Sequence, residues 1–257
     1  FDMNTVGSCI LKNCTAEGNS NYCIDENAGG SNIRGGLSAG FDCDRASNVL
    51  LEDCVAIANN PQPGGVASKV TGFYASIFPE GGYIENIVYK NCTSLNHSSD
   101  FPGTFVAGFL IGENPPTTIV INSNQIILEG CVAEGNVNTS NPGNGAGVSF
   151  ENWTTSSSVQ NCIFKGNGVG ILVRGENTVS NLFKNNEISA NSEYGIADFT
   201  QNLNSYAMNY AYNPDAIENY QGLPAFTPVR TWQIGFAPAP LDNNRTLDPL
   251  DNISVSN

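Results

Sequence analysis

Two short phrases alternate along most of the chain, and this repetition constrains the fold more than any other feature. The first phrase has an apolar residue three positions before a cysteine, which usually follows Asn, Asp or Gly. The second phrase joins a glycine to a large apolar residue. Strict alternation of two strand-like phrases indicates a solenoid in which each cycle forms one coil. The copies centre on Cys14, Cys54, Cys92, Cys131, Cys162 and Asn186, and on Gly40, Gly72, Gly108, Gly147, Gly170 and Gly195.

The spacing of the glycine phrase sets the size of a coil. Successive copies are 32, 36, 39, 23 and 25 residues apart, and the shortest spacings fit three short strands joined by corners. The longer cycles are then predicted to carry insertions at residues 60–68, 97–104, 113–124 and 137–144, which are rich in Pro, Gly, Asn or Ser. We expect these insertions to project from the stack as a rim around one face.

The phrases carry a resemblance to a known superfamily. Asn13-Cys14-x-Ala16-x-x-Asn19 and Gly40-Phe41 resemble the right-handed parallel β-helix superfamily, which includes pectate-lyase-like proteins and carbohydrate-binding and sugar-hydrolase repeat proteins. The resemblance covers residues 8–200. It implies an all-β, right-handed parallel β-helix solenoid of about six coils, one for each copy of the glycine phrase, over residues 1–202. Residues 203–257, rich in Pro and Tyr, are predicted to cap the stack or to mediate assembly.

Repeated positions should form ladders, because parallel coils place equivalent residues about 4.8 Å apart. We expect an inward ladder of cysteines ending at Asn186, with an apolar ladder beside it. Stacked neighbours have parallel Cβ vectors, which suit free thiols better than disulfides. Cys9, Cys23 and Cys43 lie off this ladder, and a bridge between one pair of them stays open. An outer corner ladder of stacked amides is predicted at Asn19, Asn59, Asn136, Asn167 and Asn191.

Net charge limits the partners. The chain carries −14 at pH 7 with only ten scattered Lys and Arg residues, which argues against nucleic acid and anionic membranes. No apolar stretch is long enough to span a bilayer, so we expect no membrane insertion. The predicted partners are carbohydrate or neighbouring protein subunits, including a homo-oligomer, at an extracellular, cell-surface or virion-surface location. A chain that opens at Phe1 is interpreted as processed, trimmed or a fragment.

Candidate catalytic residues are sparse. Ala39-Gly40-Phe41-Asp42-Cys43-Asp44 partly matches the Tyr-Gly-Phe-Asp-Pro-His phrase of alginate-epimerase-like enzymes, but it lacks the Tyr and the His. Asp42, Asp44 and Arg45 could form a lyase-type site with Ca²⁺, as could Arg174 near Glu176. A solvated face with a local ion pair is the alternative for Asp42, Asp44 and Arg45. The only histidine, His97, is expected on a surface loop, and no metal site is predicted.

Aromatic residues on the predicted loops suggest sugar binding, because sugar C–H faces pack on aromatic rings. The alternative is that these rings pack the loops onto the stack. The candidates are Tyr74, Phe78, Tyr83, Phe101 and Trp153.

These observations leave three hypotheses for function. The first is a non-enzymatic adhesin or virion component with glycan binding. The second is a polysaccharide lyase or epimerase, and the third is a purely structural assembly protein.

Seven N-x-S/T sequons also occur, at Asn13, Asn91, Asn96, Asn138, Asn152, Asn244 and Asn252.

Overall fold

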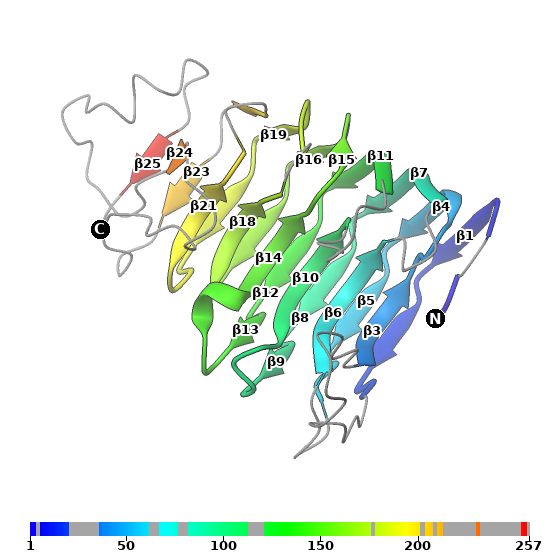
Figure 1. Ribbon diagram of the computed structural model, residues 1–257, viewed down its shortest axis with the longest axis horizontal. Helices are drawn as coiled ribbons and strands as arrows, with labels where there is room; N and C mark the ends of the chain where they lie inside the picture. Colours follow the sequence, from blue (N-terminus) through cyan, green and yellow to red (C-terminus); the bar gives the residue numbers. More distant parts are fainter. Residues whose placement is uncertain are drawn as a thin grey trace.

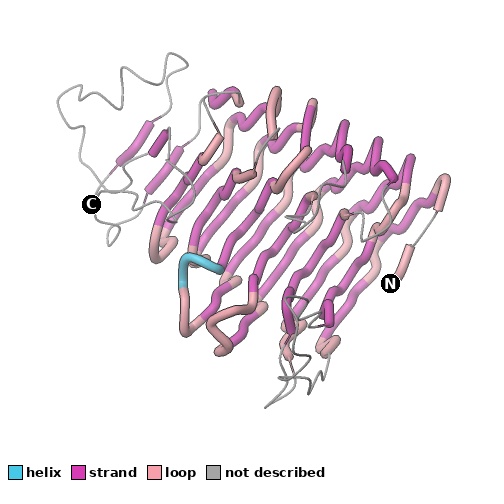
Figure 2. The backbone as a smooth tube through the Cα atoms, in the orientation of Figure 1, coloured by secondary structure: helices cyan, strands magenta, loops and turns pink. Residues whose placement is uncertain are grey.

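The computed structural model consists almost entirely of β-strands that lie side by side from one end of the chain to the other (Figure 1). It describes residues 1–3, 6–20, 36–61, 67–76, 82–112, 121–175, 178–200, 204–207, 210–212, 230–231 and 253–255. Within these ranges the helical structure is a single short 3-10 helix, η1 (Pro142–Asn144), as the backbone tube shows (Figure 2).

Three parallel sheets contain most of the strands. Sheet A contains β3 (Gly36–Asp42), β6 (Ala67–Ala75), β10 (Phe105–Ile111), β14 (Gly145–Phe150), β18 (Val169–Val173) and β21 (Tyr194–Asp198). Sheet B contains β1 (Cys9–Lys12), β4 (Ser47–Glu52), β7 (Gly82–Lys90), β11 (Ile121–Glu129), β15 (Thr154–Thr155), β16 (Ser158–Gln160), β19 (Leu182–Lys184) and β22 (Ser205–Ala207). Sheet C contains β2 (Thr15–Glu17), β5 (Val55–Ile57), β8 (Thr93–Leu95), β12 (Val132–Glu134), β17 (Ile163–Lys165), β20 (Glu187–Ser189), β23 (Tyr210–Tyr212) and β25 (Ile253–Val255).

The chain passes through sheets B, C and A in turn and then returns to sheet B one layer further along. Each strand therefore pairs in parallel with the equivalent strand of the next cycle, as β4 does with β7 and β7 with β11. The cysteine phrase forms the corner between sheets B and C, and the glycine phrase forms a strand of sheet A. This arrangement is compatible with the predicted parallel β-helix.

The predicted interior ladders are confirmed by the register. Leu51, Tyr89 and Leu128 are direct partners in sheet B, and all three are fully buried. In sheet A the rings of Phe41, Phe73 and Phe109 stack, with centroids 4.9 and 4.7 Å apart. The remaining members continue these columns to the other coils, namely Leu11, Val159 and Phe183 in sheet B and Val148, Ile171 and Ile196 in sheet A.

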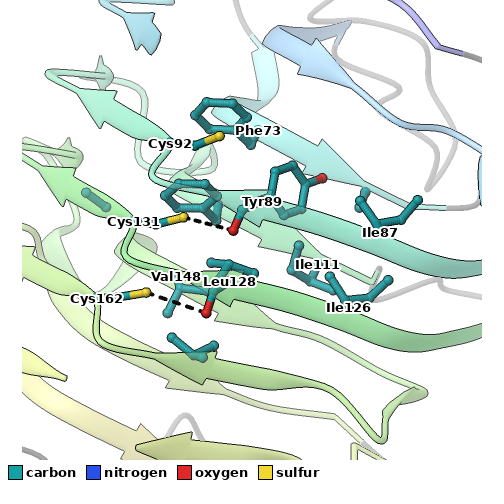
Figure 3. Close-up of a cluster of buried hydrophobic side chains, with 14 of the residues drawn as sticks. Phe73, Ile87, Tyr89, Cys92, Ile111, Ile126, Leu128, Cys131, Val148 and Cys162 are labelled. Atoms are coloured by element: carbon teal, nitrogen blue, oxygen red, sulfur yellow. Dashed lines mark hydrogen bonds between the residues drawn. The ribbon is translucent and has the colours of Figure 1, made fainter. Parts of the chain in front are cut away.

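The inward cysteines are stacked free thiols, as predicted (Figure 3). Cys131 Sγ donates to the carbonyl oxygen of Tyr89 at 3.3 Å, one coil earlier, and Cys162 Sγ lies 3.7 Å from that of Leu128. Cys9 and Cys43 are also free, so they do not form the disulfide that the sequence left open. Cys23 lies outside the described residues.

The two-residue corner between sheets B and C explains the turn-former before each cysteine. The residue at this place has a positive φ of 51–65° in all six copies, a conformation that Asn, Asp and Gly adopt most readily. This sharp bend turns the following cysteine into the interior. The six residues are Asn13, Asp53, Asn91, Gly130, Asn161 and Asn185.

The repeated glycine of sheet A is required by close packing between coils. A Cβ at Gly147 would lie 2.7 Å from the carbonyl oxygen of Gly170 and 2.8 Å from Cδ1 of Phe164. The equivalent glycines face the same obstacle, because each missing Cβ points at the carbonyl oxygen of the glycine in the next coil. No side chain larger than hydrogen fits this column without a shift of the backbone.

The predicted asparagine ladder exists, but its position differs from the prediction. Asn59, Asn136, Asn167 and Asn191 are fully buried, so the ladder lines the interior of the corner between sheets C and A rather than its outside. Both N–H groups of Asn136, on the backbone and the side chain, donate to Asn167 Oδ1 at 3.0 and 2.9 Å. Burial of a polar group costs free energy unless the group is hydrogen-bonded, and these bonds offset that cost for the inward amides.

Two predicted insertions form an ordered ledge beside sheet A. The insertion at residues 97–104 contains β9 (Ser98–Ser99), which pairs in parallel with β13 (Val137–Asn138) of the insertion at 137–144. The side-chain amide of Asn138 donates to the carbonyl oxygens of Phe101 and Thr104 at 2.8 and 2.7 Å. We call residues 97–104 and 137–144 the ledge. Residues 62–66 and 113–120 of the other two insertions lie outside the described residues.

The sheets continue beyond residue 202, where the sequence suggested a change of segment. β22 pairs with β19 and β23 pairs with β20, both in parallel. Further along, β24 (Arg230–Thr231) pairs antiparallel with β21, and β25 pairs with β23. The intervening residues 213–229 and 232–252, and with them most of the predicted cap, lie outside the described residues.

Candidate functional site

The outer face of sheet A carries two of the candidate residues, Asp42 and Tyr74, as direct partners in neighbouring strands. Side chains alternate along a strand, so Phe41, Phe73 and Phe109 point into the core while Asp42, Tyr74 and Leu110, one position later, point outward. Yet Tyr74 and Leu110 are only 4% and 1% exposed. This outer face therefore carries a second apolar cluster, separate from the core, around its polar residues.

Asp42 ends β3 at this face and has an unusual environment. Burial, with the like charges of Asp44 and Asp2, raises the pKa of Asp42 from 3.8 to about 7. A backbone hydrogen bond at Asp44 and the positive terminal amine act in the opposite direction. A carboxyl group whose pKa lies near neutrality can act as a general acid or a general base.

Arg45 follows at the tight turn after β3, with a φ of 51°. Its backbone N–H donates to the carbonyl oxygen of Ser76 in the next coil at 3.2 Å, while the N–H of Cys43 donates to that of Tyr74 at 2.8 Å. Asp42, Asp44 and Arg45 are all half-buried. The three candidates therefore share one turn, anchored to β6 and the residue that follows it.

A Lys–Tyr pair lies beside Asp42 on the same face. Tyr74 is the register partner of Asp42, and Lys69 Nζ lies 3.4 Å from the Tyr74 hydroxyl and 5.5 Å from its ring centroid. Lys69 was not predicted from the sequence, because nothing in its local pattern sets it apart. Its proximity to Tyr74 follows only from their shared outward face.

An ion pair between half-buried Arg174 and buried Glu151 lies further along the same sheet. Arg174 Nε and Nη2 both donate to Glu151 Oε1 at 2.8 Å, and Ser149 Oγ donates to the same oxygen at 2.8 Å. The guanidinium carbon lies 4.4 Å from the ring centroid of Phe105, close enough for a cation–π contact. Arg174 thus pairs with Glu151 of the preceding coil, whereas the sequence suggested Glu176, which lies outside the described residues.

The predicted sugar-binding rings have different surroundings. Phe101 is 39% exposed on the ledge, whereas Trp153 is half-buried against the core and has a φ of 65°. Tyr74 is buried, as described above. Phe78 and the side chain of Tyr83 lie outside the described residues. Phe101 is therefore the described candidate whose ring is most open to a ligand.

His97 is not on the surface, and that prediction was wrong. Its side chain is fully buried and occupies the asparagine ladder of its coil. The sequence does indicate this position. His97 follows Cys92 by five residues, and the same spacing separates the cysteine from the asparagine in two neighbouring coils, at Cys54 and Asn59 and at Cys131 and Asn136. Histidine satisfies the position because its ring nitrogen can accept a hydrogen bond as an amide oxygen does.

The exposed sequons can be separated from the buried ones. Asn13, Asn91 and Asn96 are exposed, Asn152 is half-buried, and Asn138 is fully buried with its amide bonded inside the ledge. Asn244 and Asn252 lie outside the described residues.

In the described part of the chain, no three His, Cys, Asp or Glu side chains are placed to hold a metal ion. The same residues contain no helix long and apolar enough to cross a membrane. Comparisons with protein family models, curated proteins and solved structures found no match.

Proposed function

We propose that this chain is a right-handed parallel β-helix that acts as a rigid, non-enzymatic module on a cell or virion surface and binds carbohydrate. The right hand rests on the general rule for connections between parallel strands of one sheet. The resemblance of the repeated phrases to the β-helix superfamily supports the same architecture.

One observation carries the structural role: the repeated polar side chains of the interior bond from coil to coil. Asn136 bonds to Asn167, Asn167 bonds to Asn191 Oδ1 at 3.0 and 3.2 Å, and the thiols donate to carbonyl oxygens of the preceding coil. Such groups stabilise the stack and are not available for chemistry on a substrate. A long scaffold of this kind suits display of a binding surface.

Carbohydrate is the favoured ligand because of the side chains around sheet A. Phe101 offers an exposed ring on the ledge, and the half-buried Arg174 lies with Glu151 on the adjacent face. Rings pack against sugar C–H groups, while guanidinium and carboxylate groups bond to hydroxyls. Direct attraction of a polyanion is disfavoured by the net charge of −14, so neutral glycans are expected to bind best.

The test is binding to an array of neutral and acidic glycans, followed by titration of the best ligand. Phe101→Ala should weaken binding about 5- to 30-fold, as expected for loss of about 1–2 kcal/mol of ring contact. Ile163→Ala is a matched control, because Ile163 is 37% exposed on sheet C and Phe101 is 39% exposed. Equal losses in both variants, or no binding by the wild type, would contradict carbohydrate binding. A stable oligomer without glycan binding would favour the purely structural role.

A second candidate function is a polysaccharide lyase or epimerase that uses Asp42 and Asp44. The raised pKa of Asp42, about 7, beside a second carboxylate supports it. A lyase should then release unsaturated products that absorb in the ultraviolet from uronate polymers, with and without added Ca²⁺, whereas an epimerase should change the ratio of the uronate epimers without forming unsaturated products. Asp42→Asn and Asp44→Asn should abolish this activity, whereas Asp53→Asn, at an exposed corner where other coils carry Asn, should not.

A further inference from the structure

His97 interrupts a ladder whose other members are asparagines. Between Asn136, Asn167 and Asn191, the backbone N–H of each residue donates to the Oδ1 atom of the next residue at 3.0 Å. At His97 the acceptor is a ring nitrogen instead, since Asn59 N–H donates to His97 Nδ1 at 2.9 Å. An amide oxygen cannot take up a proton near neutral pH, but an imidazole can.

This hydrogen bond determines the state of the ring. Nδ1 can accept from Asn59 only without a hydrogen, so the neutral ring carries its hydrogen on Nε2. The Nε2 atom and the nearby Ser94 Oγ are both buried without hydrogen-bond partners. Both lie near Gly72, where a Cβ atom in place of the hydrogen would lie 2.7 Å from Nε2 and 2.2 Å from the Ser94 oxygen.

A protonated ring has no compensating partner in this corner. The neighbours that face it are Gly72 of β6, Ser94 of β8, and Asn59 and Asn136 from the corners before and after it. None of these residues carries a charge or titrates near neutral pH. A proton on Nδ1 would also face the Asn59 N–H directly, so protonation and the closed corner exclude each other.

We propose that His97 is an acid-sensitive latch, which holds this corner closed as a neutral imidazole and favours its opening when the ring takes up a proton. The ledge would open with it. The carbonyl oxygen of His97 accepts from Val137 N–H at 2.9 Å, and Ser98 N–H donates to Asn60 Oδ1 at 2.7 Å. Release of His97 therefore loosens the bond between the two ledge segments and the bond that joins Ser98 to Asn60 of the preceding coil.

The direction of the pH dependence follows from burial. Burial lowers the pKa of His97 from 6.5 to about 3 in the closed corner, while an opened corner returns the ring to its ordinary pKa. The stabilising contribution is therefore complete above pH 6.5 and is lost as the pH falls toward about 3. Within this window, the opening equilibrium constant should rise about tenfold per pH unit.

The experiment uses the fact that His97 is the only histidine in the chain. Its imidazole proton resonances can be followed directly by NMR from about pH 8 to pH 4.5. In the folded protein they should not titrate over this range, whereas in urea they should titrate near the ordinary value of about 6.5. Hydrogen exchange, normalised for intrinsic rates, should show protection falling at residues 96–104 and 137–139 as the pH decreases.

The matched control is His97→Asn, which restores the amide used by the other coils. This variant should keep the ledge protected and lose the tenfold-per-unit pH dependence. A folded-state titration near pH 6 with the corner still protected would overturn the latch, as would an identical pH dependence in His97→Asn. If the variant does not fold, the wild-type titration and exchange data still decide the question.

Discussion

At one inward corner position, cysteine and asparagine satisfy the same carbonyl group. Cys131 Sγ donates to the carbonyl oxygen of Tyr89, and Asn186 Nδ2 donates to that of Val159 at 3.0 Å in the equivalent geometry. Asn186 Oδ1 also accepts from Cys162 N–H at 3.0 Å. In both cases a small side chain with a donor reaches a carbonyl oxygen of the preceding coil.

Replacement of Cys131 tests this equivalence. Cys131→Asn should fold with a free energy of unfolding within about 1 kcal/mol of the wild type, because the donor is kept. Cys131→Val should lose about 0.5–1.5 kcal/mol, because the hydrogen bond from the thiol to the Tyr89 carbonyl oxygen is removed. Urea unfolding of both variants measures the difference. A valine variant as stable as the asparagine variant would show that the thiol acts only by its volume.

Asp42 should make the protein less stable as the pH rises, whereas His97 should make its corner less stable as the pH falls. Its folded pKa of about 7 lies above the ordinary value of 3.8, so the folded state keeps a proton that the unfolded chain releases. The free energy of unfolding should therefore decrease as the pH rises from about 4 to 7, and Asp42→Asn should remove this decrease. Unfolding measured across that range checks it, with Asp53→Asn as the control. An unchanged slope in Asp42→Asn would contradict the raised pKa.

At the scale of single strands, the glycine column sets how closely the coils of sheet A approach one another. Gly40, Gly72, Gly108, Gly147 and Gly170 each place a missing Cβ within 2.9 Å of the next glycine's carbonyl oxygen. The same column allows the neighbouring aromatic rings to stack at 4.7–4.9 Å. A single added methyl group should therefore disturb two layers at once.

Gly147→Ala should be destabilising by about 1–3 kcal/mol, in the range typical of overpacked cores. Gly7→Ala is the matched control, because no atom lies within 4 Å of the position that its Cβ would take. Thermal or urea unfolding of the two variants separates the effect of packing from the general effect of replacing glycine. Similar stabilities would show that the backbone of sheet A can relax around the extra carbon.

For the whole molecule, stability comes from contacts between adjacent coils, as in other repeat proteins. The free cysteines of the described residues confirm that no disulfide links the layers there. Cys43, Cys54, Cys92, Cys131 and Cys162 are at most 1% exposed, whereas Cys9 and Cys14 are half-buried in the first described layer. Thiol accessibility should therefore report on the opening of the stack.

Thiol labelling of the native protein should modify Cys9 and Cys14 first among the described cysteines. The five buried thiols should react only as fast as the stack opens, because the reagent cannot reach them in the closed form. Mass spectrometry of labelled peptides identifies the order. Rapid labelling of Cys92 or Cys131 in native conditions would contradict a tightly packed interior.

The repeated interior could be predicted from the sequence, whereas the outer face could not. Each coil must place the same kinds of side chain at the same inward positions, so the phrases around Cys54 and Gly72 identified the register. The Arg174–Glu151 pair lies outside this constraint, because it depends on which outward residues meet across two coils. His97 is a third case. It follows its cysteine at the regular spacing of five residues, but a histidine was not recognised as equivalent to the asparagines of the other coils.

The asparagine ladder has a consequence for how such a stack joins anything else. The backbone N–H groups of Asn19, Asn136 and Asn167 each donate to an Oδ1 atom of the next coil, and that of Asn59 donates to His97 Nδ1. These bonds share a single sense along the axis. The ladder therefore has a direction, with hydrogen-bond acceptors facing one end of the stack and donors facing the other. Another coil could extend it only by running in the same sense, because two identical ends brought face to face would oppose acceptor to acceptor at one end of the stack and donor to donor at the other.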